Sequence, residues 1–240
     1  MCGRLNVIDD AGVQALLKQL NIDLWPEPFI HSRFVRATQP VSIVREIKAG
    51  AGGVGSEHLR EVRAADWWLL QERTETSFKP SKYTSFNTRY DKLNAPRSAG
   101  YKPFRETRCI IPAKGFGETE FVNKKPKHYF DMQAVEGEAI AFGGLYKEWH
   151  HPDTGEWKLS CSVITLPPHP KIQNIHSKAM PLILPQKGSW MDAWLNPKTD
   201  PQSLLPLLTP HLPQSLIAQQ INKPSEYQGI AEPFVIKQDV

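Results

Sequence analysis

The sequence has few cysteines, no long hydrophobic run and no recognisable targeting segment. Its three cysteines, Cys2, Cys109 and Cys161, cannot all pair, which argues against a disulfide framework and favours a reducing, intracellular compartment. No apolar run approaches the roughly 20 residues that a membrane helix needs, so no membrane association is expected. No basic region followed by an apolar one marks a secretory signal. We therefore expect a cytoplasmic protein, associated with the nucleoid if it is bacterial.

Several common catalytic and cofactor signatures are also missing. There is no Cys-x-x-Cys or His-x-x-x-His spacing, and the adjacent His150 and His151 would point in different directions on a strand, so we expect neither a metal site nor a cofactor. The absence of Gly-x-Ser-x-Gly excludes that type of hydrolase elbow. The glycine-rich segment 49–55 is not followed by Lys-Ser or Lys-Thr and does not match a phosphate-binding loop.

Hydrophobic periodicity predicts few helices and many strands. Asp9 or Asp10 can cap a helix that runs to about Leu20, and short helices are expected after Ser189 and over 201–208. The expected strands cover 41–47, 67–70, 109–113, 127–132, 138–146, 158–166, 180–184 and 234–236. The 21 prolines argue against a helix bundle, and no stretch resembles a linker. We expect one domain over residues 1–240, of the α+β class and built on a largely antiparallel sheet or barrel.

Positive charge is concentrated in one part of the chain. Arg73 to Arg108 holds nine basic and three acidic residues, a balance of +6 against +4 for the whole chain. Four aromatic residues, Phe78, Tyr83, Phe86 and Tyr90, are interleaved with them. Cations for phosphates and flat rings for bases are what a single-stranded nucleic acid requires. The alternative is a solvated loop whose aromatic rings turn inward, and composition does not decide between the two.

Cys2 directly follows Met1, and removal of Met1 would make it the N-terminus. Its α-amine and thiol would then form a 1,2-aminothiol, with ordinary pKa values near ~8 and ~8.5. The amine can condense with an aldehyde to a Schiff base, and the thiol can close on that imine to give a thiazolidine ring. The alternative is that Cys2 is an ordinary buried residue of a first strand.

Two further segments carry polar groups suited to catalysis. In Asn87-Thr88-Arg89, the amide can bond a carbonyl or hydroxyl group, and the guanidinium can bind a phosphate. Glu118 follows a glycine-containing bend after an apolar strand, where a carboxylate can act as general acid or base, with Glu120 as a competitor. The alternatives are a plain turn and an exposed turn glutamate.

A third candidate is His176, which precedes a short predicted strand. With Lys178 two residues further on, it could shuttle protons beside an anionic ligand. The alternative is an ordinary loop histidine at the end of a helix.

Together, these stretches resemble the SOS response-associated peptidase (SRAP) family, whose members process abasic sites in DNA. The matching segments are Met-Cys-Gly-Arg at 1–4, Asn87-Thr88-Arg89, 108–118, 142–146, 175–181, 194–197 and 221–222. The set is ordered along nearly the whole chain. The sequence departs from the family pattern in the longer spacing from His176 to Pro181, in Lys178 where arginine is common, and in Trp67-Trp68 where Trp-Gly is usual.

The resemblance implies a compact β-rich domain with a basic groove that binds single-stranded DNA, and we expect a monomer. Cys2 would be the nucleophile and would end as a thiazolidine crosslink to an abasic site. Removal of Met1 would account for the peptidase label. Asn87 would position the sugar or the amine, Glu118 would move protons during imine formation, and His176 would help to open the sugar ring.

The resemblance also implies DNA-binding residues outside this catalytic set. They are Arg4, Arg89 and Lys178, which would hold phosphates, and Trp67, which would stack near the lesion.

Two other functions remain alternatives. One is a non-covalent module that binds single-stranded DNA through the basic and aromatic residues alone. The other is a thiol peptidase acting on other proteins, with Cys2 and His176 as a dyad. A flexible N-terminal cysteine is a poor peptidase nucleophile without a rigid oxyanion site, which disfavours the second alternative.

Overall fold

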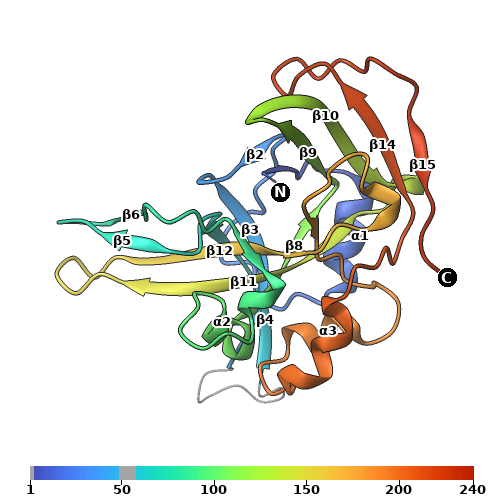
Figure 1. Cartoon of the computed structure of the whole chain (residues 1–240). Helices are drawn as coiled ribbons and strands as arrows, with labels where there is room; N and C mark the ends of the chain where they lie inside the picture. Colours follow the sequence, from blue (N-terminus) through green and yellow to red (C-terminus); the bar gives the residue numbers. More distant parts are fainter. Residues whose placement is uncertain (1–2, 49–57) are drawn as a thin grey trace.

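The protein is built around a closed barrel of strands (Figure 1). The structure, a computed structural model of the whole chain, describes residues 3–48 and 58–240, and the glycine-rich segment 49–55 lies outside them. The barrel strands are β3 (Pro40–Lys48), β4 (His58–Asp66), β8 (Arg108–Ala113), β11 (Ile140–His150) and β12 (Trp157–Leu166). Their order is β11-β8-β3-β4-β12, and the barrel closes because β11 also pairs with β12. Neighbouring strands are antiparallel except β4 and β12.

A second, antiparallel sheet lies beside the barrel, at the upper right in Figure 1. Its order is β15-β14-β10-β9-β1-β2. Its strands are β1 (Arg4–Asn6), β2 (Val35–Arg36), β9 (Gly115–Val122), β10 (Lys125–Ala134), β14 (Leu216–Ile221) and β15 (Phe234–Ile236). Lys114 alone separates β8 from β9, so one continuous segment links the barrel to the sheet. The backbone N–H of Lys114 donates to the carbonyl of Asn6, and the Lys114 ammonium lies 2.7 Å from a carboxylate oxygen of Asp10.

Short strands extend the barrel at the carboxyl end of β12. There β7 (Asn87–Arg89) pairs with β12 in parallel, and β13 (Met180–Pro181) pairs with it in the antiparallel sense. Two more strands, β5 (Gln71–Arg73) and β6 (Phe78–Pro80), form a hairpin of their own. This hairpin and the outer halves of β11 and β12 form the arm at the left of Figure 1.

Helices are few and short in the described part of the chain. They are α1 (Ala11–Gln19), α2 (Tyr101–Glu106) and α3 (Trp190–Leu195), with 3₁₀ segments at η1 (Tyr90–Lys92), η2 (Val135–Gly137), η3 (Pro170–Ile172) and η4 (Pro201–Leu208). The cap of α1 is as expected, because the Asp10 side chain accepts a hydrogen bond from the N–H of Val13. None of these helices has the length and apolar character needed to cross a membrane.

The β-rich α+β class is confirmed, and most of the expected strands are present within a few residues of their predicted bounds. Segment 67–70 is not a strand, because β4 ends at Asp66 and Trp67 and Leu69 turn into the core. Segment 201–208 is a 3₁₀ helix with Pro206 inside it, since proline has no N–H for regular α-helical bonding. The prediction missed β4 and β9, whose charged residues and glycines break the apolar alternation of a strand, and β14, which contains the polar pair Gln219 and Gln220.

The barrel is attached to both neighbouring helices through Arg108, which is only 3% exposed. Its guanidinium donates to the carbonyls of Phe104 at 2.7 Å, Trp194 at 2.7 Å and Asn196 at 2.5 Å. Burial lowers the pKa of Arg108 to about 10, so the group stays charged at neutral pH. Each of these bonds satisfies a carbonyl at the end of α2 or α3.

Replacement of Arg108 by Gln should lower the free energy of unfolding by about 3 kcal/mol or more, because several buried carbonyls lose their donor. Urea denaturation followed by tryptophan fluorescence measures the effect. The control is Arg36→Gln, at an exposed arginine of β2, for which a change within about 0.5 kcal/mol is expected. Equal stability of the two variants would contradict the anchoring role of Arg108.

Candidate functional site

Strand β9 carries a buried carboxyl group where the sheet meets the barrel. Side chains alternate along a strand, so Phe116, Glu118 and Glu120 face the same side of β9. Phe116 packs into the core against Phe142, and Glu118 follows it with only 2% of its surface exposed. Burial raises the pKa of Glu118 to about 7. A carboxyl group with that pKa is present in both protonation states at neutral pH and can exchange protons in either direction.

His176 faces the same carboxyl group from the loop between η3 and β13. Its Nδ1 lies 3.8 Å from a carboxylate oxygen of Glu118 and 3.3 Å from one of Glu120. The histidine is 2% exposed, and burial lowers its pKa to about 4. The imidazole is therefore neutral at pH 7. It lies beside Glu118, whose pKa is close to that pH.

Glu120 fixes the loop that carries His176. Its carboxylate accepts hydrogen bonds from the backbone N–H of Ser177 at 3.1 Å and from the Ser177 hydroxyl at 2.6 Å. Although partial burial opposes it, these bonds lower the pKa of Glu120. His128, opposite Glu120 on β10, adds a hydrogen bond between its Nε2 and the carbonyl of Ile175. Sequence reasoning missed His128 and Ser177, and it treated Glu120 only as a competitor of Glu118.

Arg4 is part of the support beneath Glu118. It pairs with Gly117 across β1 and β9, and its guanidinium donates to the carbonyls of Glu118 at 3.3 Å and Phe130 at 3.2 Å. A Cβ atom at residue 117 would lie 2.5 Å from the guanidinium, so any residue larger than glycine would displace the guanidinium from this position. Arg4 is 7% exposed, and this side chain therefore positions the strand, in contrast to the phosphate contact expected from the sequence.

The nucleophile predicted from the sequence, Cys2, lies outside the described residues. The other two cysteines are fully buried, and burial raises the pKa of both thiols. Among the described residues, no group of three or more histidine, cysteine, aspartate or glutamate side chains could hold a metal ion.

Asn87, Arg89 and Lys178 lie around the carboxyl end of β12. In β7, Asn87 is opposite Val163 and Arg89 is opposite Thr165, while β13 pairs its Pro181 with the same threonine. Arg89 and Lys178 line one depression of about 400 Å³. Asn87 and Arg89 line the next, of about 270 Å³. The side chain of Arg89 is 66% exposed and lies 3.0 Å from Asp91, so its charge is open to solvent but shared with a carboxylate.

Trp67 does not face this surface. It is completely buried, and its indole N–H donates to the carbonyl of Phe86 at 2.8 Å. Stacking of Trp67 on DNA, expected from the resemblance, is incompatible with this position. Its ring is part of the core and contacts Phe86 edge-on at 5.9 Å.

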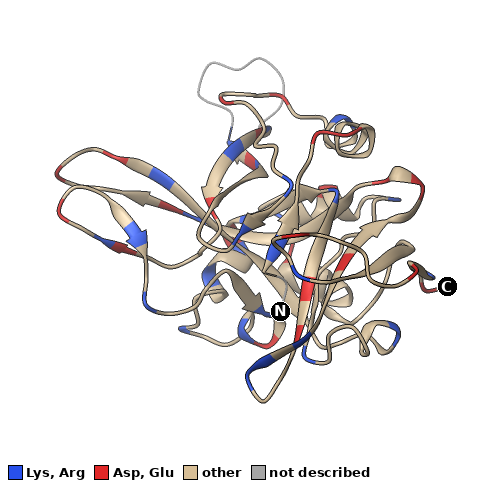
Figure 2. Cartoon of the chain, turned by 90° about the horizontal axis from the view of Figure 1, so that it is seen from above, with Lys and Arg blue, Asp and Glu red and all other residues tan. Residues whose placement is uncertain are grey.

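The basic segment from Arg73 to Arg108 divides between interior and surface. Arg108 is buried, and Arg105 donates to the carbonyls of Leu93 and Tyr101. Of the aromatic residues, Phe78 is buried and Phe86 is half-buried, whereas Tyr83 is 63% and Tyr90 is 37% exposed. Figure 2 shows basic and acidic positions interspersed along the arm at the left. The inward position of Phe78 and Phe86 agrees with the second interpretation, and binding of a nucleic acid by the exposed residues stays a prediction.

Comparisons with known proteins agree on one family. The model of the family described as "SOS response associated peptidase (SRAP)" matches residues 1–224. The abasic site processing proteins YoqW and YobE of Bacillus subtilis are each 30% identical to the chain over 224 residues, which is 92% of this chain and 92% and 94% of theirs.

Solved structures show the same fold at lower identity. A protein from Bordetella bronchiseptica has a TM-score of 0.68 at 18% identity and covers 92% of this chain and 100% of its own. One from Bacteroides thetaiotaomicron has a TM-score of 0.69 at 19% identity and covers 96% and 100%.

The raised pKa of Glu118 should make the folded protein less stable as pH rises. Between pH 4.5 and about 7 the folded state holds a proton that the unfolded state has released, so stability is lost over that range. At about 1.4 kcal/mol per pKa unit, the penalty at pH 8 is about 3 kcal/mol. Replacement of Glu118 by Gln should remove it, which urea denaturation at pH 5 and pH 8 would measure. Glu138→Gln, at an exposed glutamate, is the control and should keep the wild-type dependence. An unchanged dependence in Glu118→Gln would contradict the assignment.

Proposed function

Because the chain belongs to the SOS response-associated peptidase (SRAP) family, we propose that it processes abasic sites in single-stranded DNA and becomes joined to them covalently through Cys2. The observation that carries the proposal is the buried pair of Glu118 and His176, which lies beside the strand that begins at Arg4. The names of the Bacillus subtilis relatives support abasic sites as the substrate.

The reactive group is the 1,2-aminothiol that Cys2 would present after loss of Met1. Arg4 is held opposite Gly117, next to Glu118, and two residues of chain span at most about 7 Å. This short reach favours a reaction beside Glu118, the residue of β9 that follows the last one paired with β1. Removal of Met1 by the protein itself would be the peptidase activity of the family name.

The chemistry needs one group that both gives and takes protons. The Cys2 amine adds to the aldehyde carbon of the opened sugar, and the resulting carbinolamine loses water to form an imine. Glu118 donates a proton to the departing hydroxyl and takes one from the nitrogen. The thiol then adds to the imine carbon, its proton passes to the nitrogen, and the thiazolidine ring closes. A pKa of about 7 suits both directions of transfer.

His176 and Asn87 act on the sugar in this proposal. The abasic sugar is mainly a closed hemiacetal, and the neutral His176 takes the proton from its anomeric hydroxyl and returns it to the ring oxygen as the bond between that oxygen and the anomeric carbon breaks. Asn87 donates or accepts a hydrogen bond at the sugar or at the amine. Arg89 and Lys178, which line one depression, hold the flanking phosphates. Tyr90 lines the same depression and is exposed, so it offers a ring to a base.

The crosslink can be tested on a denaturing gel. Protein shown by mass to lack Met1 should give a heat-stable shifted band with a strand that carries one abasic site, and none with the intact strand. Cys2→Ser should abolish the band, and Glu118→Gln should slow its formation by about 100-fold, because the general acid and base is lost. A band that persists at the wild-type rate in both variants would overturn the mechanism. Salt-sensitive binding without any band would favour the non-covalent module.

Glu120 should act as a positioning residue for His176. Its charge raises the pKa of His176 against the larger effect of burial, so Glu120→Gln should move the acid limb of the crosslinking pH profile to lower pH. The initial rate at pH 7 should fall by roughly tenfold as the loop loses its tether. Ser177→Ala is the matched control, because it removes a hydrogen bond to Glu120 but keeps the charge, and its acid limb should stay in place. Identical pH profiles for the wild type and Glu120→Gln would count against this role.

A further inference from the structure

Three depressions on the surface share their lining residues and form a continuous row. The first, with Arg89 and Lys178, and the second, with Asn87 and Lys92, both include Arg89 in their walls. The second and the third both include Ser98 and Ala99. The row therefore leads from Arg89 and Lys178, past η1, to a third cavity of about 480 Å³ between α2 and β11.

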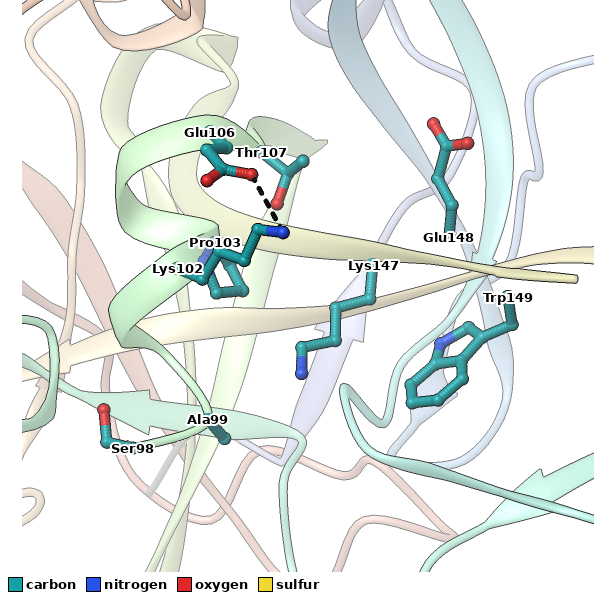
Figure 3. Close-up of a pocket in the computed structure, with 9 residues that line it drawn as sticks. All are labelled: Ser98, Ala99, Lys102, Pro103, Glu106, Thr107, Lys147, Glu148 and Trp149. Atoms are coloured by element: carbon teal, nitrogen blue, oxygen red, sulfur yellow. Dashed lines mark ion pairs between the residues drawn. The ribbon is translucent and has the colours of Figure 1, made fainter. Parts of the chain in front are cut away.

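The third cavity brings together two lysines from different elements (Figure 3). Lys102 extends from α2 and Lys147 from β11, and the side chains of both lie at the space between these elements. Burial lowers the pKa of Lys147, and the charge of Lys102 adds to this effect. The like charges thus oppose each other there, an arrangement that a bound anion would relieve.

The carboxylates around the cavity do not neutralise both lysines. Glu106 lies 3.5 Å from Lys102, on the exposed side of α2. Glu148 forms an ion pair with Arg45 and, by strand alternation, faces the opposite side of β11 from Lys147. Among the described residues, Lys147 has no carboxylate within ion-pair distance, and its nearest aromatic contact is Trp149 at 5.8 Å.

Trp149 gives the cavity an aromatic wall that is already oriented. Its indole N–H donates to the Ser160 hydroxyl at 2.8 Å, and its ring packs against Phe78 at 5.9 Å. A fixed ring beside two ammonium groups suits a nucleotide, whose base can stack while its phosphate meets the cations. An inorganic anion has no ring that could stack on the indole of Trp149.

We propose that the cavity between α2 and β11 is a second subsite for the DNA strand, where Lys102 and Lys147 bind a backbone phosphate and Trp149 stacks a base. The subsite rests on the proposed function, since the strand that occupies it is the one that carries the lesion. The shared walls of the row favour a continuous strand over a free nucleotide. The subsite would increase the affinity for the strand beside the lesion and would leave the rate of the chemical step at Cys2 unchanged.

The test compares strands whose single abasic site is followed by an arm of increasing length, in one series on the 5′ side and in another on the 3′ side. With the longest arm of one series, K102Q/K147Q should crosslink roughly tenfold more slowly than the wild type at limiting protein, and with the shortest arm equally fast. At saturating protein the rates should be equal. The salt dependence of the long-arm rate should weaken by about 0.7 in logarithmic slope, which corresponds to the one phosphate contact that the two lysines share.

Two further variants make the comparison specific. K18Q/K187Q removes the same charge at exposed lysines that line none of the three depressions, and it should match the wild type at every length. Trp149→Leu should slow crosslinking of the long arm without changing the salt slope, because stacking releases no counterions.

The proposal is overturned if K102Q/K147Q crosslinks at the wild-type rate at every arm length. It is also overturned if the rate falls by the same factor at every arm length, because that result would be a long-range effect of charge. Binding of thymidine monophosphate that depends on both lysines, with no effect of arm length, would assign the cavity to a free nucleotide instead. Failure of the proposed function would appear separately, as the absence of any lesion-dependent band from the wild type. In that case the affinities of the wild type and of K102Q/K147Q for intact strands of the same lengths, measured by fluorescence anisotropy, test the subsite on its own.

Discussion

The burial of the Glu118 carboxyl group is the constraint on which the rest of the site depends. A carboxylate in a dry environment is costly, and this cost raises its pKa to about 7. The surroundings keep the group in place despite the cost. Lys114 joins β9 directly to the barrel, and the Arg4 guanidinium, next to Gly117, donates to the backbone carbonyls of Glu118 and Phe130. Without these supports, a buried carboxyl group would move toward water and its pKa would fall. The raised pKa of the carboxyl group therefore depends on the contacts that hold β9 in place.

Part of this arrangement could be predicted from the sequence. The helix that ends near Leu20 and the strands β8, β10, β11 and β12 follow from apolar periodicity, because one face of each packs in the core. Glu118 and His176 were identified by their residue types and by the resemblance of their segments to a family, and the structure places them 3.8 Å apart. That distance depends on the pairing of β9 with β10 and on a loop far along the chain. No local pattern encodes such a contact.

The residues that sequence reasoning assigned differently share one cause. Arg4 and Trp67 are of types that commonly meet DNA, but each has a stronger partner inside the protein, namely backbone carbonyls for Arg4 and the carbonyl of Phe86 for Trp67. Burial cannot be read from residue type when the side chain is amphipathic. Glu120 shows the converse, since a glutamate that resembled a surface residue holds the histidine loop through Ser177. Strand alternation, which puts it on the same face as Glu118, was the available signal.

The shortness of β1 has a consequence for how the protein responds to heat. Only three residues attach this strand to β9, and a terminal strand of that length opens far more readily than the barrel behind it. Detachment of β1 would remove Arg4 from Gly117 and loosen the seat of Glu118, while the spectroscopic signals of the core stay unchanged. Loss of activity and loss of structure would then occur at different temperatures. The upper limit of the protein's working temperature would then be set by the three-residue pairing of β1 with β9, at a temperature where the barrel is still folded.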